Sequence, residues 1–118
     1  MDAMLERRLL GLLGLGARAR SVVVGVEQVR DAARRGKLRL AVIAPDASEN
    51  SREKVVPLLT ARRIRMVEGP SAAALGGVVG RQATAAIGVV DEQLARGIRA
   101  LLEASTGERP DGRPARAP

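Results

Sequence analysis

The sequence contains no cysteine, no histidine, and no phenylalanine, tyrosine or tryptophan. Without Cys and His, the chain lacks thiolate nucleophiles, the usual zinc ligands and the side chain that titrates near neutral pH. Most familiar catalytic arrangements are therefore excluded, and we expect neither an enzyme nor a bound cofactor or metal. The lack of Cys also removes any argument for an oxidising compartment.

The chain also lacks aromatic rings and long apolar runs, and both absences restrict its function further. RRM and OB domains usually stack single-stranded bases on aromatic side chains, which this chain does not have. The longest uncharged apolar stretches, Leu9–Ala17 and Ser71–Gly80, are well short of the about 18 residues of a membrane helix. No charged segment leads into a signal-type apolar run. We therefore expect a soluble cytoplasmic protein without a membrane partner.

Length and charge indicate one basic domain. The 118 residues suffice for a single core, and 20 Lys and Arg against 13 Asp and Glu give a net charge of +7. From Ser105 onward, three prolines and two glycines interrupt any periodic pattern. We expect a folded domain over residues 1–104 and a disordered tail over 105–118. The surplus charge lies mostly in the domain, and it favours a polyanion such as nucleic acid as partner.

Within the domain, short β-branched runs alternate with segments of helical period, in the order αβαβαβαβα. This pattern predicts an α/β fold, a three-layer α/β/α sandwich around a four-stranded mixed sheet. The run 38–44 is apolar enough to be a central strand that is buried on both faces. The predicted strands are 22–24, 38–44, 64–67 and 85–90.

Helix ends are predicted from capping residues. The first helix buries Leu5, Leu9, Leu12 and Leu13, and Gly14 or Gly16 would end it. The second helix, with Val26, Val29 and Ala33 on its apolar face, would end at Gly36.

Two further helices have recognisable starts. Asn50 and Glu53 have the spacing of a capping box that opens the third helix. Pro57 removes one backbone hydrogen bond there, so we expect a kink or a late start. Ser71 is placed to cap the fourth helix.

The segment from Val24 to Arg30 joins a strand to a helix through Gly25. A helix start presents unpaired N–H groups and a positive dipole end to phosphate. Glu27 and Gln28, in the first turn, could reach base edges; Gln28 both donates and accepts, whereas Glu27 accepts only. An ordinary solvated face with an acidic first turn explains the same residues, and the spacing alone leaves both interpretations open.

Basic residues gather in three places. Arg18 and Arg20 precede the first strand, and a group after the second helix could join them in one patch. A third group follows the third helix, where cations also suit the dipole of a helix end. The second group is Arg34, Arg35, Lys37 and Arg39, and the third is Arg62, Arg63 and Arg65.

Three local patterns occur in a fixed order along the chain: Gly-Val-Glu-Gln-Val at 25–29, Leu-Ala-Val-Ile-Ala-Pro-Asp-Ala-Ser at 40–48, and Leu-Gly-Gly-Val-Val-Gly-Arg at 75–81. Together with the order of elements they resemble the kink-turn-binding ribosomal protein family, the large-subunit seven-Ae and thirty-e family, and most closely its bacterial YlxQ-like branch. The resemblance covers about residues 5–103. Each pattern alone is weak, but the ordered set is fairly specific.

The resemblance implies a sandwich that grips bent RNA helices, with the Gly25–Arg30 junction on tandem G·A pairs and a loop at 82–86 on splayed nucleotides. The chain departs from the family pattern in having Glu27-Gln28 in place of an Asn-Glu pair, and Asp31 at a place that is commonly basic. The expected RNA-binding residues are Arg18, Arg20, Gly25, Val26, Glu27, Gln28, Arg30, Arg34, Arg81, Gln82, Ala83 and Thr84.

The expected function is the binding of structured RNA, kink-turn-like or ribosomal, by a ribosomal or ribosome-associated protein that is a monomer when free. One alternative is a protein-binding adaptor in translation or ribosome assembly, with ribosomal or translation-related proteins as partners. Another is the substrate-recognition subunit of an RNA-modifying enzyme, whose catalytic domain would need a separate chain.

Overall fold

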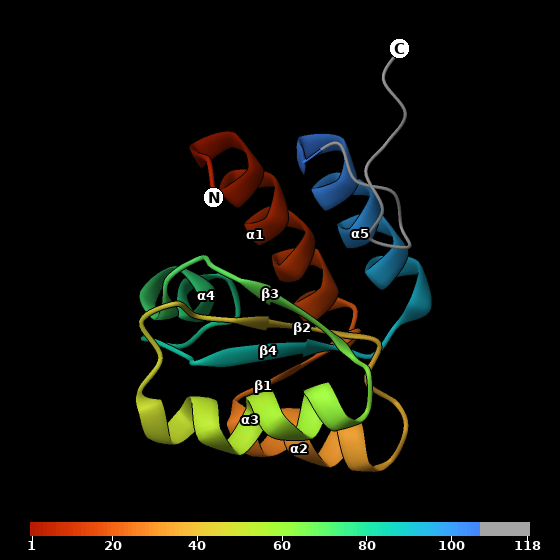
Figure 1. The fold of residues 1–118 in the computed structure, drawn as a ribbon. Coiled ribbons are helices and arrows are strands. Elements are labelled where there is room, and N and C mark those ends of the chain that lie inside the picture. Colours follow the sequence, from red (N-terminus) through yellow and green to blue (C-terminus); the bar gives the residue numbers. More distant parts are fainter. Residues whose placement is uncertain (107–118) are drawn as a thin grey trace.

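The computed structural model describes the backbone of residues 1–106 and the side chains of residues 1–104 (Figure 1). Residues 107–118 of the predicted tail lie outside the described residues. The predicted order αβαβαβαβα is confirmed. The elements are α1 (Ala3–Arg18), β1 (Val22–Val24), α2 (Val26–Arg34), β2 (Leu40–Ile43), α3 (Glu49–Ala61), β3 (Arg65–Glu68), α4 (Ala72–Val78), β4 (Ala86–Val89) and α5 (Glu92–Thr106).

The four strands form one mixed sheet in the order β1-β4-β2-β3. β2 is parallel to β3 and antiparallel to β4, and β4 is also antiparallel to β1. Because β1 and β2 both oppose β4, the strands β1, β2 and β3 run in one direction. All four residues of β2 are buried, as expected of a central apolar strand, although β2 is shorter than the predicted run.

Helices cover both faces of the sheet, which confirms the three-layer sandwich (Figure 1). On one face, Leu40 and Val42 pack with buried residues of α1, α4 and α5. On the other face, Ala41 and Ile43 pack with buried residues of α2 and α3. This split follows from the period of a strand, since successive side chains point to opposite faces. The core is therefore two aliphatic layers on either side of β2 and β4.

The prediction that Gly14 or Gly16 ends the first helix is wrong, because α1 continues to Arg18. A Cβ on Gly16 would lie 2.4 Å from Leu94 Cδ2 and 3.0 Å from Val22 Cγ1. Glycine at this position therefore allows α1 to pack closely against α5 and β1. The helix ends where Arg20 adopts a positive φ of 60° and Ser21 N–H donates to the Gly16 carbonyl oxygen at 2.7 Å.

The predicted start of the third helix is also wrong. The N-cap of α3 is Ser48, whose side chain accepts a hydrogen bond from Ser51 N–H at 3.1 Å, so Asn50 lies inside the helix. Pro57 does not delay the start of the helix, because α3 begins at Glu49 and continues past Pro57 to Ala61. Pro57 removes one backbone hydrogen bond from the helix. Val55 and Leu59 are buried on either side of it, and this packing against the sheet stabilises the helix despite the loss.

Two other caps are confirmed. Ser71 accepts a hydrogen bond from Ala74 N–H at 3.2 Å and caps α4. Gly36 follows α2 with a φ of 72°, the left-handed conformation that glycine adopts readily. Among the helices described, none is long and apolar enough to cross a bilayer.

Candidate nucleic-acid interface

The junction between β1 and α2 exposes the start of a helix. Gly25 has φ 98° and ψ 158°, a combination that is essentially restricted to glycine. Its N–H donates to the Ala86 carbonyl oxygen at 2.9 Å, which ties the junction to the start of β4. Within the described residues no side chain caps α2, so its first-turn N–H groups are available to a ligand.

A hollow of about 370 Å³ lies in front of this junction. Three segments far apart in the sequence meet here: the β1–α2 junction, the first turns of α3 and the loop after α4. Two cations, Lys54 and Arg81, therefore lie at the same opening as the start of α2. The lining residues are Val24, Gly25, Val26, Glu27, Gln28, Ser51, Lys54 and Arg81.

Sequence reasoning missed Ser51 and Lys54 as candidates for this site. Both belong to α3, which packs beside α2 on the same face of the sheet. Nothing in the local pattern around them distinguishes them from a solvated helix face. Their membership in the site follows from how the two helices pack, which no local signal in the chain encodes.

Backbone hydrogen bonds attach the loop between α4 and β4 to α4. Arg81 N–H donates to the Gly76 carbonyl oxygen at 2.8 Å, and Thr84 N–H donates to the Ala72 carbonyl oxygen at 3.0 Å. A Cβ on Gly76 would lie 2.6 Å from Ala83 Cα, so glycine permits the loop to pack on α4. The loop therefore has a fixed backbone against the end of the sheet.

The four loop residues in the expected site differ in exposure. Arg81, Gln82 and Ala83 are exposed. Thr84 is buried, and its hydroxyl donates to the Ala86 carbonyl oxygen at 3.2 Å. Thr84 therefore orders the loop from inside, while the three residues before it are available for contact.

Acidic residues near the junction are partly neutralised. Arg30 lies 3.4 Å from Glu27, and Arg35 lies 3.1 Å from Asp31. Arg30 Nε is buried and has no hydrogen-bond partner in the described part of the chain, and Arg30 is not among the residues that line the hollow. The acidity that distinguishes this junction from the family pattern is thus offset by arginines of the same helix.

Three of the expected residues lie away from the hollow. Arg18 and Arg20 precede β1, whereas Gly25 follows it, so the length of the strand separates them. Arg34 is at the opposite end of α2 from Glu27, about 10 Å along the helix axis at 1.5 Å per residue. The structure does not bring these arginines together with the junction.

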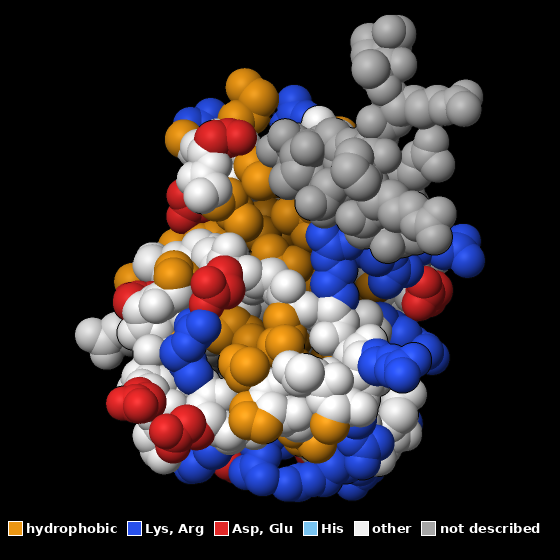
Figure 2. Space-filling model, in the orientation of Figure 1, with side chains coloured by type: hydrophobic (Ala, Val, Ile, Leu, Met, Phe, Trp, Pro, Cys, Tyr) orange, Lys and Arg blue, Asp and Glu red, His pale blue; other side chains and the backbone are white. Residues whose placement is uncertain are grey.

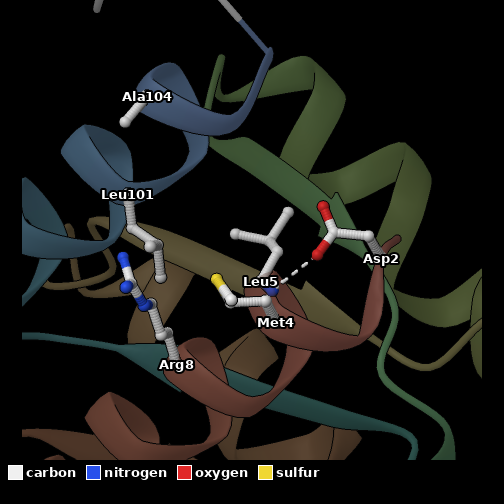
Figure 3. Close-up of a pocket in the computed structure, with 6 residues that line it drawn as sticks. All are labelled: Asp2, Met4, Leu5, Arg8, Leu101 and Ala104. Atoms are coloured by element: carbon white, nitrogen blue, oxygen red, sulfur yellow. Dashed lines mark hydrogen bonds between the residues drawn. The ribbon is translucent and has the colours of Figure 1, made fainter.

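A second hollow, among the described residues, is lined by fewer charged groups. This hollow, of about 210 Å³, lies between the start of α1 and the end of α5 (Figure 3). Its carboxylate, Asp2, accepts a hydrogen bond from Leu5 N–H at 2.9 Å and caps α1, and Arg8 extends toward Leu101. In the described residues no group of three or more Asp or Glu is arranged to hold a metal ion.

Comparison with known proteins identifies a family and a relative of this chain. The family model of the ribosomal protein L7Ae/L30e/S12e/Gadd45 family matches residues 7–98. The chain is 33% identical over 92 residues to the RNA-binding protein YlxQ of Bacillus subtilis (strain 168), covering 78% of this chain and 92% of that protein.

Two solved structures are similar to the whole fold. A protein of unknown function from Bacillus halodurans C has a TM-score of 0.74 at 32% identity, over 80% of this chain and 96% of that chain. The Giardia lamblia 15.5kD RNA binding protein has a TM-score of 0.73 at 21% identity, over 88% and 89% of the two chains, a likeness of fold. The match to the family model and the YlxQ relative confirm the expected resemblance: the chain belongs to the ribosomal protein L7Ae/L30e/S12e/Gadd45 family.

Proposed function

We propose that this protein binds structured RNA at the hollow between the β1–α2 junction, α3 and the loop before β4. Membership of a ribosomal protein family supports this proposal, and so does the relative that is named an RNA-binding protein. In this proposal the protein acts in the cytoplasm as a ribosomal or ribosome-associated component, with RNA as its partner and no reaction of its own.

One observation carries the proposal. Gly25, at a φ of 98°, turns the uncapped start of α2 toward an opening that Lys54 and Arg81 also line. Helix N–H groups and two cations suit the phosphates of RNA, whereas Gln28 can donate to and accept from base edges. Gly25–Arg30 would then contact tandem G·A pairs of a kink-turn, and 81–83 would contact nucleotides that leave the stack.

The test compares two RNAs of equal length. One contains a kink-turn, and the other has its tandem G·A pairs replaced by Watson–Crick pairs. We expect tighter binding to the kink-turn RNA, with an affinity that falls as salt rises. Equal affinity for the two would contradict kink-turn recognition, and failure to bind either at low salt would contradict RNA binding itself.

A protein-binding adaptor is the second candidate, and an apolar groove favours it. The groove, about 760 Å³, runs between α1 and α5 and includes Leu12, Leu15 and Leu101. Leu15 is 58% exposed and lines the groove together with Leu12 and Leu101, so the exposed apolar surface there is contiguous. A pull-down before and after nuclease treatment separates the candidates: a partner retained without RNA supports the adaptor, and a partner lost supports tethering through RNA.

A further inference from the structure

The positive charge of the chain is concentrated at one end of the sheet, opposite the proposed RNA site. Because β1, β2 and β3 run in one direction, their amino ends share an edge, and their carboxyl ends share the edge with the hollow. In the described residues eleven Lys and Arg side chains have no ion pair, and five of them lie in the segments that lead into these three strands. We define the basic end as Arg20, Lys37, Arg39, Arg62, Arg63 and Arg65.

These cations are exposed and largely uncompensated. All are exposed except Arg65, which is partly buried. In the portion of the chain that is described, Arg39 alone of the six has an ion pair, at 3.9 Å from Glu92, and Glu92 is shared with two arginines of α5. Figure 2 shows Lys and Arg side chains gathered on the right-hand side, where β2, β3 and α5 begin in Figure 1.

The opposite end of the sheet has no comparable surplus. Glu27 and Asp46 follow the carboxyl ends of β1 and β2, and Glu68 is the last residue of β3. Arg30 pairs with Glu27, and Arg52 pairs with Glu68, so these arginines are partly neutralised. Among the described cations without an ion pair, Lys54 and Arg81 lie at this end, whereas five lie at the basic end.

Two members of the basic end have an unfavourable backbone conformation. Arg20 has φ 60° and Arg63 has φ 56°, the left-handed region that a residue with a Cβ adopts at a cost. Each follows a helix at the position where glycine is usual, and the next residue's N–H bonds back into that helix: Ser21 to Gly16 and Ile64 to Leu59. Glycine would suit the fold better at both places. Arginine at these positions places a long cationic side chain on the surface at this backbone cost.

We propose that the basic end is a second RNA-binding surface, which holds the phosphate backbone of an RNA segment separate from the one in the hollow. The edge from β1 to β3 spans three strand spacings, about 14 Å, which is long enough to contact several consecutive phosphates of one strand. This surface has no aromatic ring on which a base could stack, and its cations suit the phosphate backbone. The inference goes beyond the proposed function and does not depend on kink-turn recognition.

The experiment uses a plain RNA duplex without a bulge as its probe. The variant Arg20→Gly/Arg63→Gly removes two cations from the basic end and relieves two left-handed residues. We expect the duplex to bind about tenfold more weakly at low salt, with a slope of log affinity against log salt that is smaller by about two. The unfolding midpoint should equal or exceed that of the unsubstituted protein, so that weaker binding cannot be attributed to unfolding.

The control is Arg7→Ala/Arg8→Ala, which removes the same charge from exposed positions near the start of α1. This control should leave duplex affinity within about twofold. Equal losses in the two variants, or no binding of the duplex by the unsubstituted protein at low salt, would overturn the second surface.

The two proposals fail separately. If the second surface exists, Arg20→Gly/Arg63→Gly keeps the preference for kink-turn RNA over its G·A-free counterpart while losing duplex affinity. If the unsubstituted protein shows no such preference but the variant still loses duplex binding, the hollow is not a kink-turn site and the basic end remains supported.

Discussion

The N–H of Gly25 donates a hydrogen bond to the carbonyl oxygen of Ala86 at 2.9 Å, and this contact joins the β1–α2 junction to the strand that follows the loop after α4. Gly25 follows β1 and is the N-cap of α2, whereas Ala86 is the first residue of β4. The start of α2 and the loop after α4 thus have a fixed relative position. A substitution that displaces one of these segments should therefore displace the other.

Gly25→Ala should destabilise the protein by about 1–3 kcal/mol, because alanine is strained at this φ and ψ. Steric overlap is not the cause of this destabilisation, since no neighbouring heavy atom lies within 4 Å of the added Cβ. The free energy of unfolding in urea measures the effect. Gly11→Ala, inside α1 and equally unobstructed, should instead stabilise by roughly 0.5–1 kcal/mol. Equal stability of the two variants would contradict the backbone argument.

Gly76→Ala should displace the loop before β4. The added Cβ would lie 2.6 and 2.7 Å from the Cα and N of Ala83, and backbone cannot give way as a flexible side chain does. We expect a destabilisation of about 1–3 kcal/mol and weaker RNA binding. Gly77→Ala is the matched control on the same helix, because nothing lies within 4 Å there. The contact is unimportant if Gly76→Ala binds RNA as Gly77→Ala does.

Lys54→Ala and Arg81→Ala should each weaken the binding of all RNAs to a similar degree. Both residues line the hollow, and point charges on phosphate carry no sequence information. Titrations over a series of salt concentrations should show a slope smaller by about one for each variant. An unchanged slope would mean that the replaced cation does not contact phosphate.

Gln28→Ala should act differently, because an amide can read base edges. We expect the preference for kink-turn RNA over its G·A-free counterpart to fall, by about 1–3 kcal/mol for a lost bidentate contact. Gln28 is exposed, so stability should change little. Competition between the two RNAs for the variant measures the preference directly, and a preference like that of the unsubstituted protein would exclude Gln28 from recognition.

Leu9→Ala should destabilise the fold by about 2–5 kcal/mol, since this side chain is fully buried between α1 and the sheet. Leu15 lies on the same helix but is 58% exposed, and Leu15→Ala should change stability by less than about 0.5 kcal/mol. Thermal or urea unfolding of both variants checks the contrast. Similar losses would mean that the groove beside α5 is covered in solution.

Local chemistry was enough to predict the elements. The β-branched runs gave the four strands, and Ser71 and Gly36 marked helix ends because capping depends on neighbouring residues. The errors arose where distant packing decided the outcome. Gly16 was predicted to end the helix, but it lies inside α1. Glycine is needed there because Leu94 and Val22 leave no room for a Cβ.

In the candidate site, too, local sequence predicted some residues and distant packing determined the others. The β1–α2 junction is contiguous in sequence, so Gly25 and Gln28 could be selected from the chain. Lys54 reaches the hollow from α3, and Arg18 and Arg20 are directed away from it by the length of β1. Side-by-side helices and strand direction are properties of the assembled sheet.

By itself, the sequence determined the αβαβαβαβα order, the aliphatic core, the family and the absence of His and Cys chemistry. These follow from composition, periodicity and short motifs, which act over a few residues. Only the tertiary structure decided which cations meet the β1–α2 junction and which gather at the opposite edge. The reason is physical: hydrogen-bonded pairing of the strands fixes their directions, and the directions determine which distant segments share an end of the sheet.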